Sequence, residues 1–256
     1  MPAIVVIPAR YASTRFPGKP LALLKGLPII QHVYQNSLNS RLAKDVIIAT
    51  DSETIFEKVL SFGGKAMMTA NVHASGTDRI AEVAAGLDYD IIVNVQGDEP
   101  LVNPAMIDDV IAVLDDSRAS IGTLAKKIEA RREIFDPNVV KVVFDESGFA
   151  MYFSRAPIPY HRDLFGTQAH SFSIRDVPAE GLSLFKHIGI YSYRRDVLLA
   201  LTKRAPSRIE MIEKLEQLRA LEHGFRIKVK ETFFETCGVD TPEDLERMEK
   251  CLNSSS

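Results

Sequence analysis

Short apolar runs that alternate with helical patterns constrain the fold of this chain more than any other feature. Five candidate strands precede residue 130: Ala3–Ile7, Asp45–Thr50, Ala66–Met68, Ile91–Val95 and Ser120–Ala125. The first, second and fourth are nearly continuous in apolar residues, which is typical of strands covered on both faces. Ahead of the fourth run, apolar residues recur at helical spacing, at Ile80, Val83, Ala84 and Leu87. The alternation predicts a mostly parallel α/β sheet with flanking helices.

The pattern changes at about residue 139. Val139–Phe144 and Ala150–Phe153 flank the turn-forming residues 145–148, which predicts a β-hairpin. Ile188–Tyr193 predicts a further strand. Apolar residues at helical spacing then predict one helix, carrying Ile209, Ile212, Leu215, Leu218 and Leu221. Because no repeat or low-complexity linker divides the chain, we expect a single domain over residues 1–256, with a first part, 1–138, and a second part, 139–256.

A polar stretch from about Arg155 to Phe185 follows the predicted hairpin. It is longer than structureless connections in compact domains, so we expect a functional arm or an oligomer contact. Its apolar, proline-stiffened start, Ala156–Tyr160, would not be left in water on a monomer. The sequence therefore predicts a homodimer.

The composition argues against several functions. The chain has 256 residues, a net charge of −3 and no basic run, so we expect no nucleic-acid partner. No apolar run approaches the roughly 20 residues that cross a bilayer, and the start lacks a signal-peptide pattern, so no membrane partner is expected. Cys237 and Cys251 make no disulfide framework, and we expect free thiols in a reducing cytoplasm.

Three cations lie in the short loop that follows the first strand. Arg10, Arg15 and Lys19 are at the carboxyl end of that strand, where ligands bind in open α/β sheets. Small residues such as Ser13 and Gly18 let backbone N–H groups approach a ligand, and fixed cations hold phosphate oxygens. The loop has neither the P-loop nor the dinucleotide-binding glycine spacing. Anion binding is favoured, with an ordinary surface loop as the alternative.

Two aspartates are candidate metal ligands. Asp98 follows the fourth candidate strand after Gly97, which permits a tight turn, and projects from the sheet edge that faces the cationic loop. A hard divalent cation between protein and phosphate would be held there. The alternative is a helix cap, although Asn103 is better placed for that role. Asp240 precedes the predicted N-cap Thr241, so it need not serve the helix and is available to bind a ligand.

The segment before the Ile80–Leu87 helix is a second candidate for ligand contact. Ser75 is a natural N-cap residue, so a purely structural role is the strong alternative. Gly76 adds a backbone that a ligand can approach, and Arg79 adds a cation one turn into the helix. A nucleobase or a sugar could rest on this turn.

Two further pairs of polar residues share a face. His187 and Tyr191 lie on one side of a predicted strand because side chains alternate along it, with Gly189 between them. Glu210 and Gln217 are seven residues apart, which places them on one side of the predicted helix. The alternatives are a core histidine in the first case and solvated side chains in the second.

Seven segments together resemble one enzyme family. They are IPARYASTRFPGKPL, HASGTDRIAEV, NVQGDEP, FSRAPIPY, FKHIGIYSYR, IEKLEQLRALE and GVDTPEDLE, in the family's order and over nearly the whole chain. The chain resembles the 3-deoxy-manno-octulosonate cytidylyltransferases, which couple the sugar acid Kdo to CMP. It departs from them at Arg208, where the family usually has proline, and at residues 235–237, which replace a Pro/Gly-rich segment.

The resemblance implies a Rossmann-like nucleotidyltransferase fold with a dimerisation arm, and it implies roles for particular residues. CTP phosphates would be held by Ala9, Arg10, Ser13, Arg15 and Lys19. Cytosine and ribose would be surrounded by Ala74, Ser75, Gly76 and Arg79. Mg²⁺ would be bound by Asp98 and Asp240, and the sugar acid by Gln96, Arg155, His187, Tyr191, Glu210 and Gln217. Arg10, Lys19, Asp98 and Asp240 would be the catalytic residues.

The activity implied by the resemblance joins CTP and Kdo to give CMP-Kdo and pyrophosphate, which activates Kdo for lipopolysaccharide synthesis. The alternatives are a CMP-sialic acid synthetase, another sugar-nucleotide pyrophosphorylase, or a catalytically silent nucleotide-binding regulator. A pure binder needs no paired metal carboxylates, so the presence of both Asp98 and Asp240 argues against the regulator.

Overall fold

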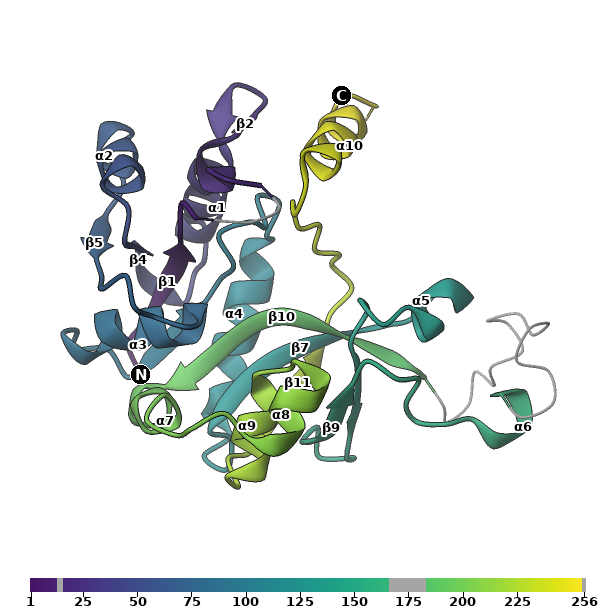
Figure 1. The fold of residues 1–256 in the computed structure, drawn as a ribbon. Helices are drawn as coiled ribbons and strands as arrows, with labels where there is room; N and C mark the ends of the chain where they lie inside the picture. Colours follow the sequence, from purple (N-terminus) through teal and green to yellow (C-terminus); the bar gives the residue numbers. More distant parts are fainter. Residues whose placement is uncertain (13–15, 166–182, 255–256) are drawn as a thin grey trace.

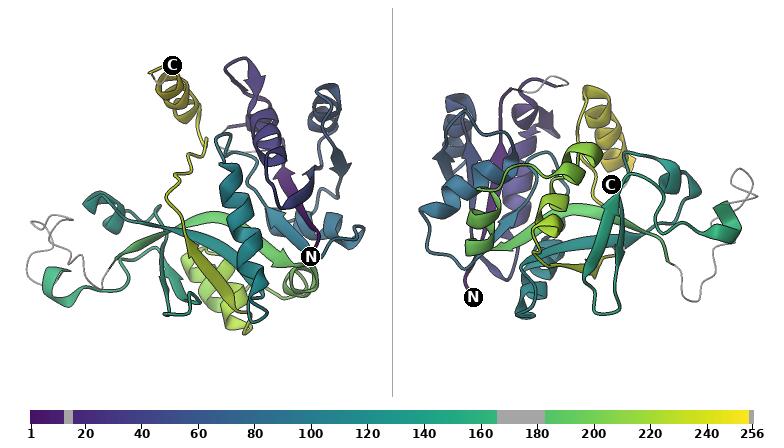
Figure 2. Two further views of the ribbon diagram at one scale, coloured as in Figure 1. Left: turned by 180° about the vertical axis from the view of Figure 1, so that it is seen from behind. Right: turned by 60° about the horizontal axis from the view of Figure 1, so that its bottom comes forward.

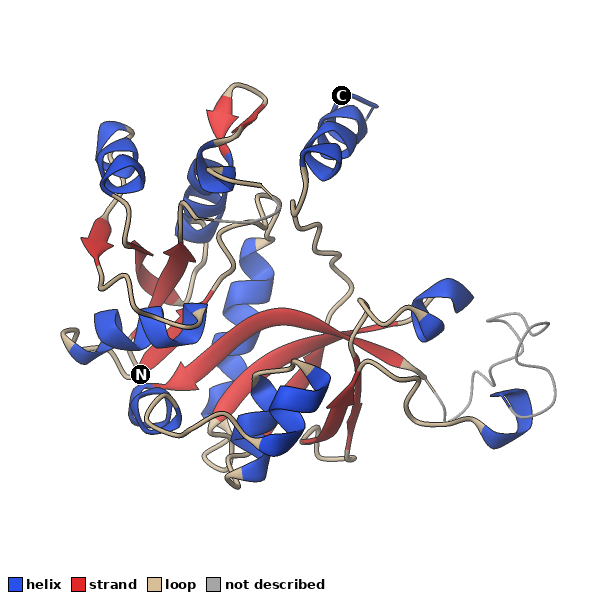
Figure 3. Cartoon of the chain, in the orientation of Figure 1, coloured by secondary structure: helices blue, strands red, loops and turns tan. Residues whose placement is uncertain are grey.

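The computed structural model describes residues 1–12, 16–165 and 183–254, and it confirms the predicted α/β fold (Figures 1 and 3). A central sheet has the strand order β11-β7-β10-β6-β1-β4-β5, with β8 and β9 joined at its side. Its strands are β1 (Ala3–Ala9), β4 (Ala43–Thr50), β5 (Ala66–Met68), β6 (Ile91–Asn94), β7 (Ile121–Lys127), β8 (Lys141–Phe144), β9 (Ala150–Ser154), β10 (Phe185–Arg194) and β11 (Ile227–Glu231). A small hairpin consists of β2 (Leu23–Leu24) and β3 (Leu27–Pro28).

Helices cover both faces of the sheet (Figure 2). They are α1 (Ile29–Leu38), α2 (Glu53–Ser61), α3 (Gly76–Ala85), α4 (Pro104–Ala112), α5 (Arg131–Phe135), α6 (Arg162–Phe165), α7 (Arg195–Leu201), α8 (Arg208–Glu213), α9 (Gln217–Glu222) and α10 (Pro242–Ser254), with 3₁₀ turns η1 (Lys19–Leu21) and η2 (Val113–Asp115). The α1, α2 and α4 helices contribute to one buried cluster, and α3, α7 and α9 contribute to the other.

The alternation of side chains along β1 explains why its sequence is continuously apolar. Val5 and Ile7 belong to the cluster on the α1/α4 face, whereas Ile4 and Val6 belong to the cluster on the α3/α7 face. All four are buried, and β1 pairs in parallel with both β4 and β6. A strand in the middle of a two-faced sheet has no exposed position for a polar residue.

The long strand β10 makes the sheet mixed. It runs antiparallel to β6, β7 and β8, and it curves across the front of the molecule in Figure 1. Its register against β7 shifts between Ile188 and Tyr191, where two extra residues of β10 face the partner strand. The predicted β8–β9 hairpin is confirmed, with Gly148 at φ 79° in its turn.

The second part of the chain differs from the sequence prediction at two places. The single predicted helix over residues 209–221 is wrong: Lys214 adopts a left-handed conformation, φ 55°, and divides the segment into α8 and α9. Ile212, expected on the buried stripe, is therefore 71% exposed. The strand β11, which no pattern predicted, pairs in parallel with β7.

The last strand and the last helix are joined by an irregular segment, residues 232–241, which we call the strap (Figure 2). It leads from β11 to α10, whose buried Met248 packs on the α1/α4-side cluster. Across the described ranges, no helix is long and apolar enough to span a membrane. Ser13 and Arg15, and residues 166–182 of the predicted arm, lie outside the described residues.

Candidate active site

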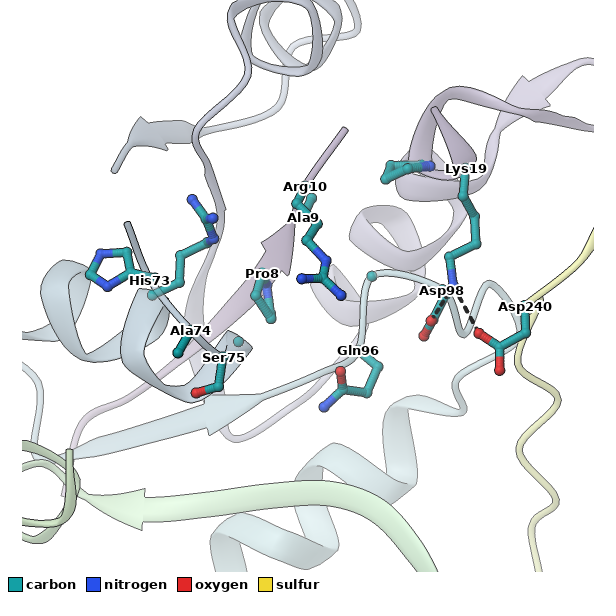
Figure 4. Close-up of a pocket in the computed structure, with 14 residues that line it drawn as sticks. Pro8, Ala9, Arg10, Lys19, His73, Ala74, Ser75, Gln96, Asp98 and Asp240 are labelled. Atoms are coloured by element: carbon teal, nitrogen blue, oxygen red, sulfur yellow. Dashed lines mark hydrogen bonds and ion pairs between the residues drawn. The ribbon is translucent and has the colours of Figure 1, made fainter. Parts of the chain in front are cut away.

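A cavity of about 250 Å³ lies at the carboxyl ends of β1 and β6 (Figure 4). Its lining comes from segments far apart in the sequence, namely Pro8, Ala9, Arg10, Lys19, Pro20, His73, Ala74, Ser75, Gly76, Arg79, Gln96, Gly97, Asp98 and Asp240. Arg10 extends from the end of β1 into this space, with Ser75 on one side and Asp98 on the other. The structure thus brings together ten of the site residues inferred from the sequence: Ala9, Arg10, Lys19, Ala74, Ser75, Gly76, Arg79, Gln96, Asp98 and Asp240.

One lysine joins the two predicted metal carboxylates. Lys19 Nζ is 2.6 Å from Asp98 Oδ2 and 3.2 Å from Asp240 Oδ1 (Figure 4). The side chain of Lys19 is 14% exposed, whereas those of Asp98 and Asp240 are 32% and 49% exposed. The pairing of Lys19 with both aspartates could not be expected from sequence, because it depends on the path of the strap.

Close backbone packing places Asp98 at this edge. A Cβ atom at Gly97 would lie 2.7 Å from the carbonyl oxygen of Pro8, so no side chain fits there. The sequence interpretation assigned Gly97 to a tight turn. The structure gives a different reason, namely the approach of the β6 end to the β1 end. Gly18, at φ 70°, does supply a left-handed turn, and its N–H bonds to Tyr11 O at 3.0 Å to bring Lys19 back over the cavity.

The Asp98–Asp240 pair fits a magnesium site. Both side chains offer oxygen donors, and both already hold a cation, the Lys19 ammonium. Within the described part of the chain, no group of three or more His, Cys, Asp or Glu residues forms a protein-only metal cage. Mg²⁺ commonly uses one or two carboxylates and completes its shell with water and substrate phosphates, so two carboxylates are a suitable set.

The start of α3 forms the wall opposite Lys19. Ser75 is the N-cap, and its Oγ accepts a hydrogen bond of 3.1 Å from Asp78 N. Arg79 borders the cavity but is only 4% exposed, and its guanidinium bonds to Asp51 at 2.7 Å and to Thr69. Arg79 therefore ties α3 to the loops after β4 and β5, and the small residues Ala74 and Gly76 are part of the wall that faces the cavity.

A second cavity of about 180 Å³, lined by both polar and apolar residues, adjoins the first through Gln96, which lines both. It lies between the sheet and helices α3 and α9. Of the residues predicted to hold a sugar acid, Gln96, Tyr191 and Gln217 line it. It also contains four polar residues that the sequence interpretation missed: Thr77, Asn94, Tyr193 and Glu216.

Asn94 and Glu216 are the most informative of these missed residues. Asn94 is 2% exposed, and its Oδ1 has no hydrogen-bond partner among the described residues. Burial raises the pKa of Glu216, with a hydrogen bond from Thr77 acting in the opposite direction. Asn94 is close to Gln96 in the segment NVQGDEP, and Glu216 directly precedes Gln217 in the segment LEQLR. This proximity to two predicted sugar-binding residues could have identified both from the sequence.

His187 lies next to this cavity without lining it. Its ring centroid is 5.1 Å from that of Phe153 and 5.2 Å from that of Tyr191, and Nε2 is 2.9 Å from Thr123 Oγ1. Burial lowers the pKa of His187 to about 3, so the imidazole is neutral. The predicted common face of His187 and Tyr191 is present, but the role of His187 as a sugar ligand stays a prediction.

Arg155 and Glu210 line neither cavity. The Arg155 guanidinium donates to the carbonyl oxygens of Glu213, Pro137 and Lys214, at 2.7, 2.8 and 3.4 Å. Glu210 accepts two hydrogen bonds from Arg219, at 2.6 and 2.8 Å, and completes the N-terminal cap of α8. Glu210 and Gln217 were expected on one helix face, but they belong to α8 and α9. The sugar-binding roles of Arg155 and Glu210 remain predictions.

The fold and this site define an α/β transferase that handles a nucleotide. The model of the cytidylyltransferase family matches residues 4–231. The chain belongs to this family and is therefore a nucleotidyltransferase.

Within the family, its relatives carry one name. The 3-deoxy-manno-octulosonate cytidylyltransferase of Geotalea daltonii is 54% identical over 250 residues, covering 97% of each chain. That of Thermodesulfovibrio yellowstonii is 51% identical and covers 100% of each chain. The solved structure of CMP:2-keto-3-deoxy-manno-octonic acid synthetase complexed with CTP is 41% identical, with a TM-score of 0.89 over the whole of both chains. A cytidylyltransferase from Leptospira borgpetersenii, 17% identical with a TM-score of 0.61, shares the fold.

Proposed function

We propose that the chain joins CTP and Kdo to give CMP-Kdo and pyrophosphate, and so activates Kdo for lipopolysaccharide synthesis. The observation that carries this proposal is the Lys19–Asp98–Asp240 group in the first cavity, which adjoins the second cavity at Gln96. The names of the relatives at 51–54% identity, and the CTP complex of the 41% identical synthetase, support the choice of both substrates.

The first cavity suits the nucleotide. Arg10 and Lys19 offer two cations for phosphate oxygens, while Ala74 and Gly76 offer small, uncharged surfaces against which a base or ribose would lie. The second cavity suits a polyhydroxylated sugar, because Asn94, Tyr191 and Gln217 combine hydrogen-bonding groups with ring surface. Gln96, which lines both cavities, marks the place where the α-phosphate would meet the attacking sugar hydroxyl.

The chemistry follows from charge. CTP and Kdo are both anions, so the protein must overcome their repulsion before the hydroxyl can attack the α-phosphate in line. Lys19 and Arg10 would hold phosphate oxygens and stabilise the charge that builds on departing pyrophosphate. Bound by Asp98 and Asp240, Mg²⁺ would supply a fixed positive charge beside the phosphates and the sugar hydroxyl. The transfer is direct and needs no covalent enzyme intermediate.

The test is incubation of the purified protein with CTP, Mg²⁺ and Kdo while pyrophosphate release is followed. Release that requires all three components, and that stops when a chelator is added, supports the proposal. Equal release with sialic acid in place of Kdo would favour the sister synthetase activity. Binding of CTP without release of pyrophosphate under any of these conditions would favour the regulator.

We infer that the protein is a homodimer through the face formed by the β8–β9 hairpin and the start of the arm. An apolar groove of about 670 Å³ lies there, lined by Val142, Val143, Phe144, Met151, Tyr152, Ile158, Pro159, Ser183 and Phe185. Met151 is 67% exposed. Sedimentation at micromolar concentration tests this: the dimer is expected for the native chain and for the control Met211→Glu on α8, and the monomer for Met151→Glu. A monomeric native chain contradicts it.

The cytoplasm is the compartment that suits this chain. Cys237 and Cys251 are both exposed, and a reducing compartment protects exposed cysteines from oxidation. Both substrates of the proposed reaction are anionic metabolites of the cell interior. Cell fractionation with an antibody against the protein would locate it, and recovery outside the cytoplasmic fraction would contradict this placement.

A further inference from the structure

The strap carries Asp240 to the site but has little structure of its own. At its start, Thr232 N–H bonds to Ala125 O at 2.8 Å. At its end, Val239 N–H bonds to Asp98 O at 2.9 Å, and Val239 is fully buried. Between these points the strap contains no helix or strand, and Phe233 is 86% exposed.

Two lysines lie under the middle of the strap. Lys126 on β7 and Lys186 on β10 are directly opposite each other in the antiparallel pair, and their side chains are only 11% and 12% exposed. Like charges directly opposite each other destabilise a sheet. The cost is larger for ammonium groups withdrawn from water, so this pair requires nearby carboxylates.

Glu235 of the strap supplies the shared carboxylate. It lies 2.7 Å from Lys126 Nζ and 3.2 Å from Lys186 Nζ. Lys186 is also paired with Glu133 at 2.5 Å, whereas the second carboxylate near Lys126 among the described residues is Glu129, at 3.9 Å. Burial acts to raise the pKa of Glu235, but the hydrogen bonds from Lys126 and Lys186 hold it below its ordinary value.

The ion pairs of Glu235 hold the middle of the strap to the sheet. Among the described residues, no other hydrogen bond or ion pair ties residues 233–238 to the sheet. Glu235 thus fixes the strap midway between its two anchored ends. Lys186, one of its partners, directly precedes His187 beside the sugar cavity.

We propose that Glu235 is a positioning residue, an ionic latch on the Lys126–Lys186 pair that holds the strap so that Asp240 stays beside Asp98 and Lys19. This inference rests on the proposed metal-binding role of Asp240. It gives Glu235 a structural role within residues 235–237, the segment in which the sequence departs from the Pro/Gly-rich pattern of its family. A stiff backbone and an ionic anchor are alternative ways to limit the freedom of a connecting segment.

The test compares Glu235→Gln with Glu129→Gln, which removes a carboxylate from the same cluster but outside the strap. Glu235→Gln is expected to raise the Mg²⁺ concentration for half-maximal activity about two- to fivefold, within the range for a partly exposed ion pair. Glu129→Gln, whose side chain is 74% exposed, is expected to leave it unchanged. If the two variants need the same Mg²⁺ concentration for half-maximal activity, the proposal is overturned.

A second comparison separates positioning from general stability. If Glu235 acts through Asp240, Glu235→Gln should slow turnover in the native background and cause no further loss in an Asp240→Asn background. The same proportional loss in both backgrounds overturns the proposal.

Amide hydrogen exchange tests the latch without relying on a measurement of enzyme activity. Exchange over residues 236–241, including the Val239 N–H, should be several-fold faster in Glu235→Gln than in Glu129→Gln. Unchanged exchange overturns the latch. If the native protein releases no pyrophosphate from CTP and Kdo, the proposed function fails, and the exchange measurement still decides whether the latch exists.

Discussion

The backbone N–H of Val239 donates a 2.9 Å hydrogen bond to the carbonyl oxygen of Asp98. This bond joins the strap to the loop after β6, and it brings the carboxylates of Asp98 and Asp240 to the same ammonium group of Lys19. Two residues far apart in the sequence therefore lie close together, and this backbone bond, with the buried Val239 side chain, is one of the contacts that hold them there.

Asp98→Asn and Asp240→Asn should each lower turnover by at least about two orders of magnitude, because a lost preorganised electrostatic contact typically costs that much. The double variant should be little slower than the worse single variant, since groups that act through one ion are non-additive. Steady-state rates at saturating Mg²⁺ measure this. Fully multiplicative losses would show that the two aspartates act separately.

A matched control for these variants is Asp109→Asn on α4. Asp109 pairs with Lys230 at 2.6 Å on the surface, away from both cavities. The expected change in turnover is less than twofold. All three variants should unfold within about 1 kcal/mol of the native chain, because their ion pairs are partly exposed.

Lys19→Ala should weaken the binding of CTP. Loss of a charge-assisted phosphate contact costs roughly 1.5–3 kcal/mol, which is about a 10- to 100-fold rise in the KM for CTP. The control is Lys58→Ala, an exposed lysine on α2. Unchanged KM and turnover in Lys19→Ala would remove this residue from the site.

Gly97→Ala should destabilise the protein by about 1–3 kcal/mol and slow turnover, because the new methyl group would overlap the carbonyl oxygen of Pro8, 2.7 Å away. Gly238→Ala is the control. It lies close to Asp240 in sequence, but its Cβ would meet no atom within 4 Å, so stability should change by less than about 0.5 kcal/mol. Urea unfolding of both variants measures the difference, and equal stabilities would contradict the close approach.

The neutral state of His187 should appear in the pH dependence of stability. Its pKa is about 3 in the folded protein and 6.5 in the unfolded chain, so the unfolded chain alone takes up a proton as the pH falls below 6.5. Relative to His187→Gln, the native protein should lose about 2 kcal/mol of its unfolding free energy between pH 6.5 and pH 5. The loss continues as the pH falls toward 3.

Chemical denaturation at both pH values measures this loss, with His223→Gln as the control at an exposed position. The control should follow the native protein. A constant stability difference between native protein and His187→Gln across this pH range would show that His187 is accessible to protons in the fold.

The core strands could be predicted from sequence because a strand that is buried on both faces consists of a short continuous run of apolar residues. The caps Ser75 and Asn103 could be predicted for a similar reason, since each bonds within its own turn. The break between α8 and α9 could not. Lys214 takes a left-handed conformation that lysine does not favour, and only tertiary packing selects it.

The places of Arg10, Lys19 and Asp98 around the first cavity were predictable, because these residues lie in the loops that follow the ends of two strands. The surroundings of Arg155 could not be predicted from the sequence. Its guanidinium lies against three carbonyl oxygens that are brought together only when Pro137 and the end of α8 meet. Glu216 was overlooked because a glutamate in an amphipathic helix is usually solvated, and its enclosure depends on the break at Lys214.

The strand β10 has a mechanical consequence for catalysis. Its end at Tyr191–Arg194 bonds to β6 in the first part of the chain, while its start at Phe185 and Lys186 bonds to β8 in the second. Rotation of one part against the other would bend a continuous hydrogen-bonded strand, which resists such deformation. We therefore expect the two parts to move as one body, with no hinge at the change of sequence pattern near residue 139.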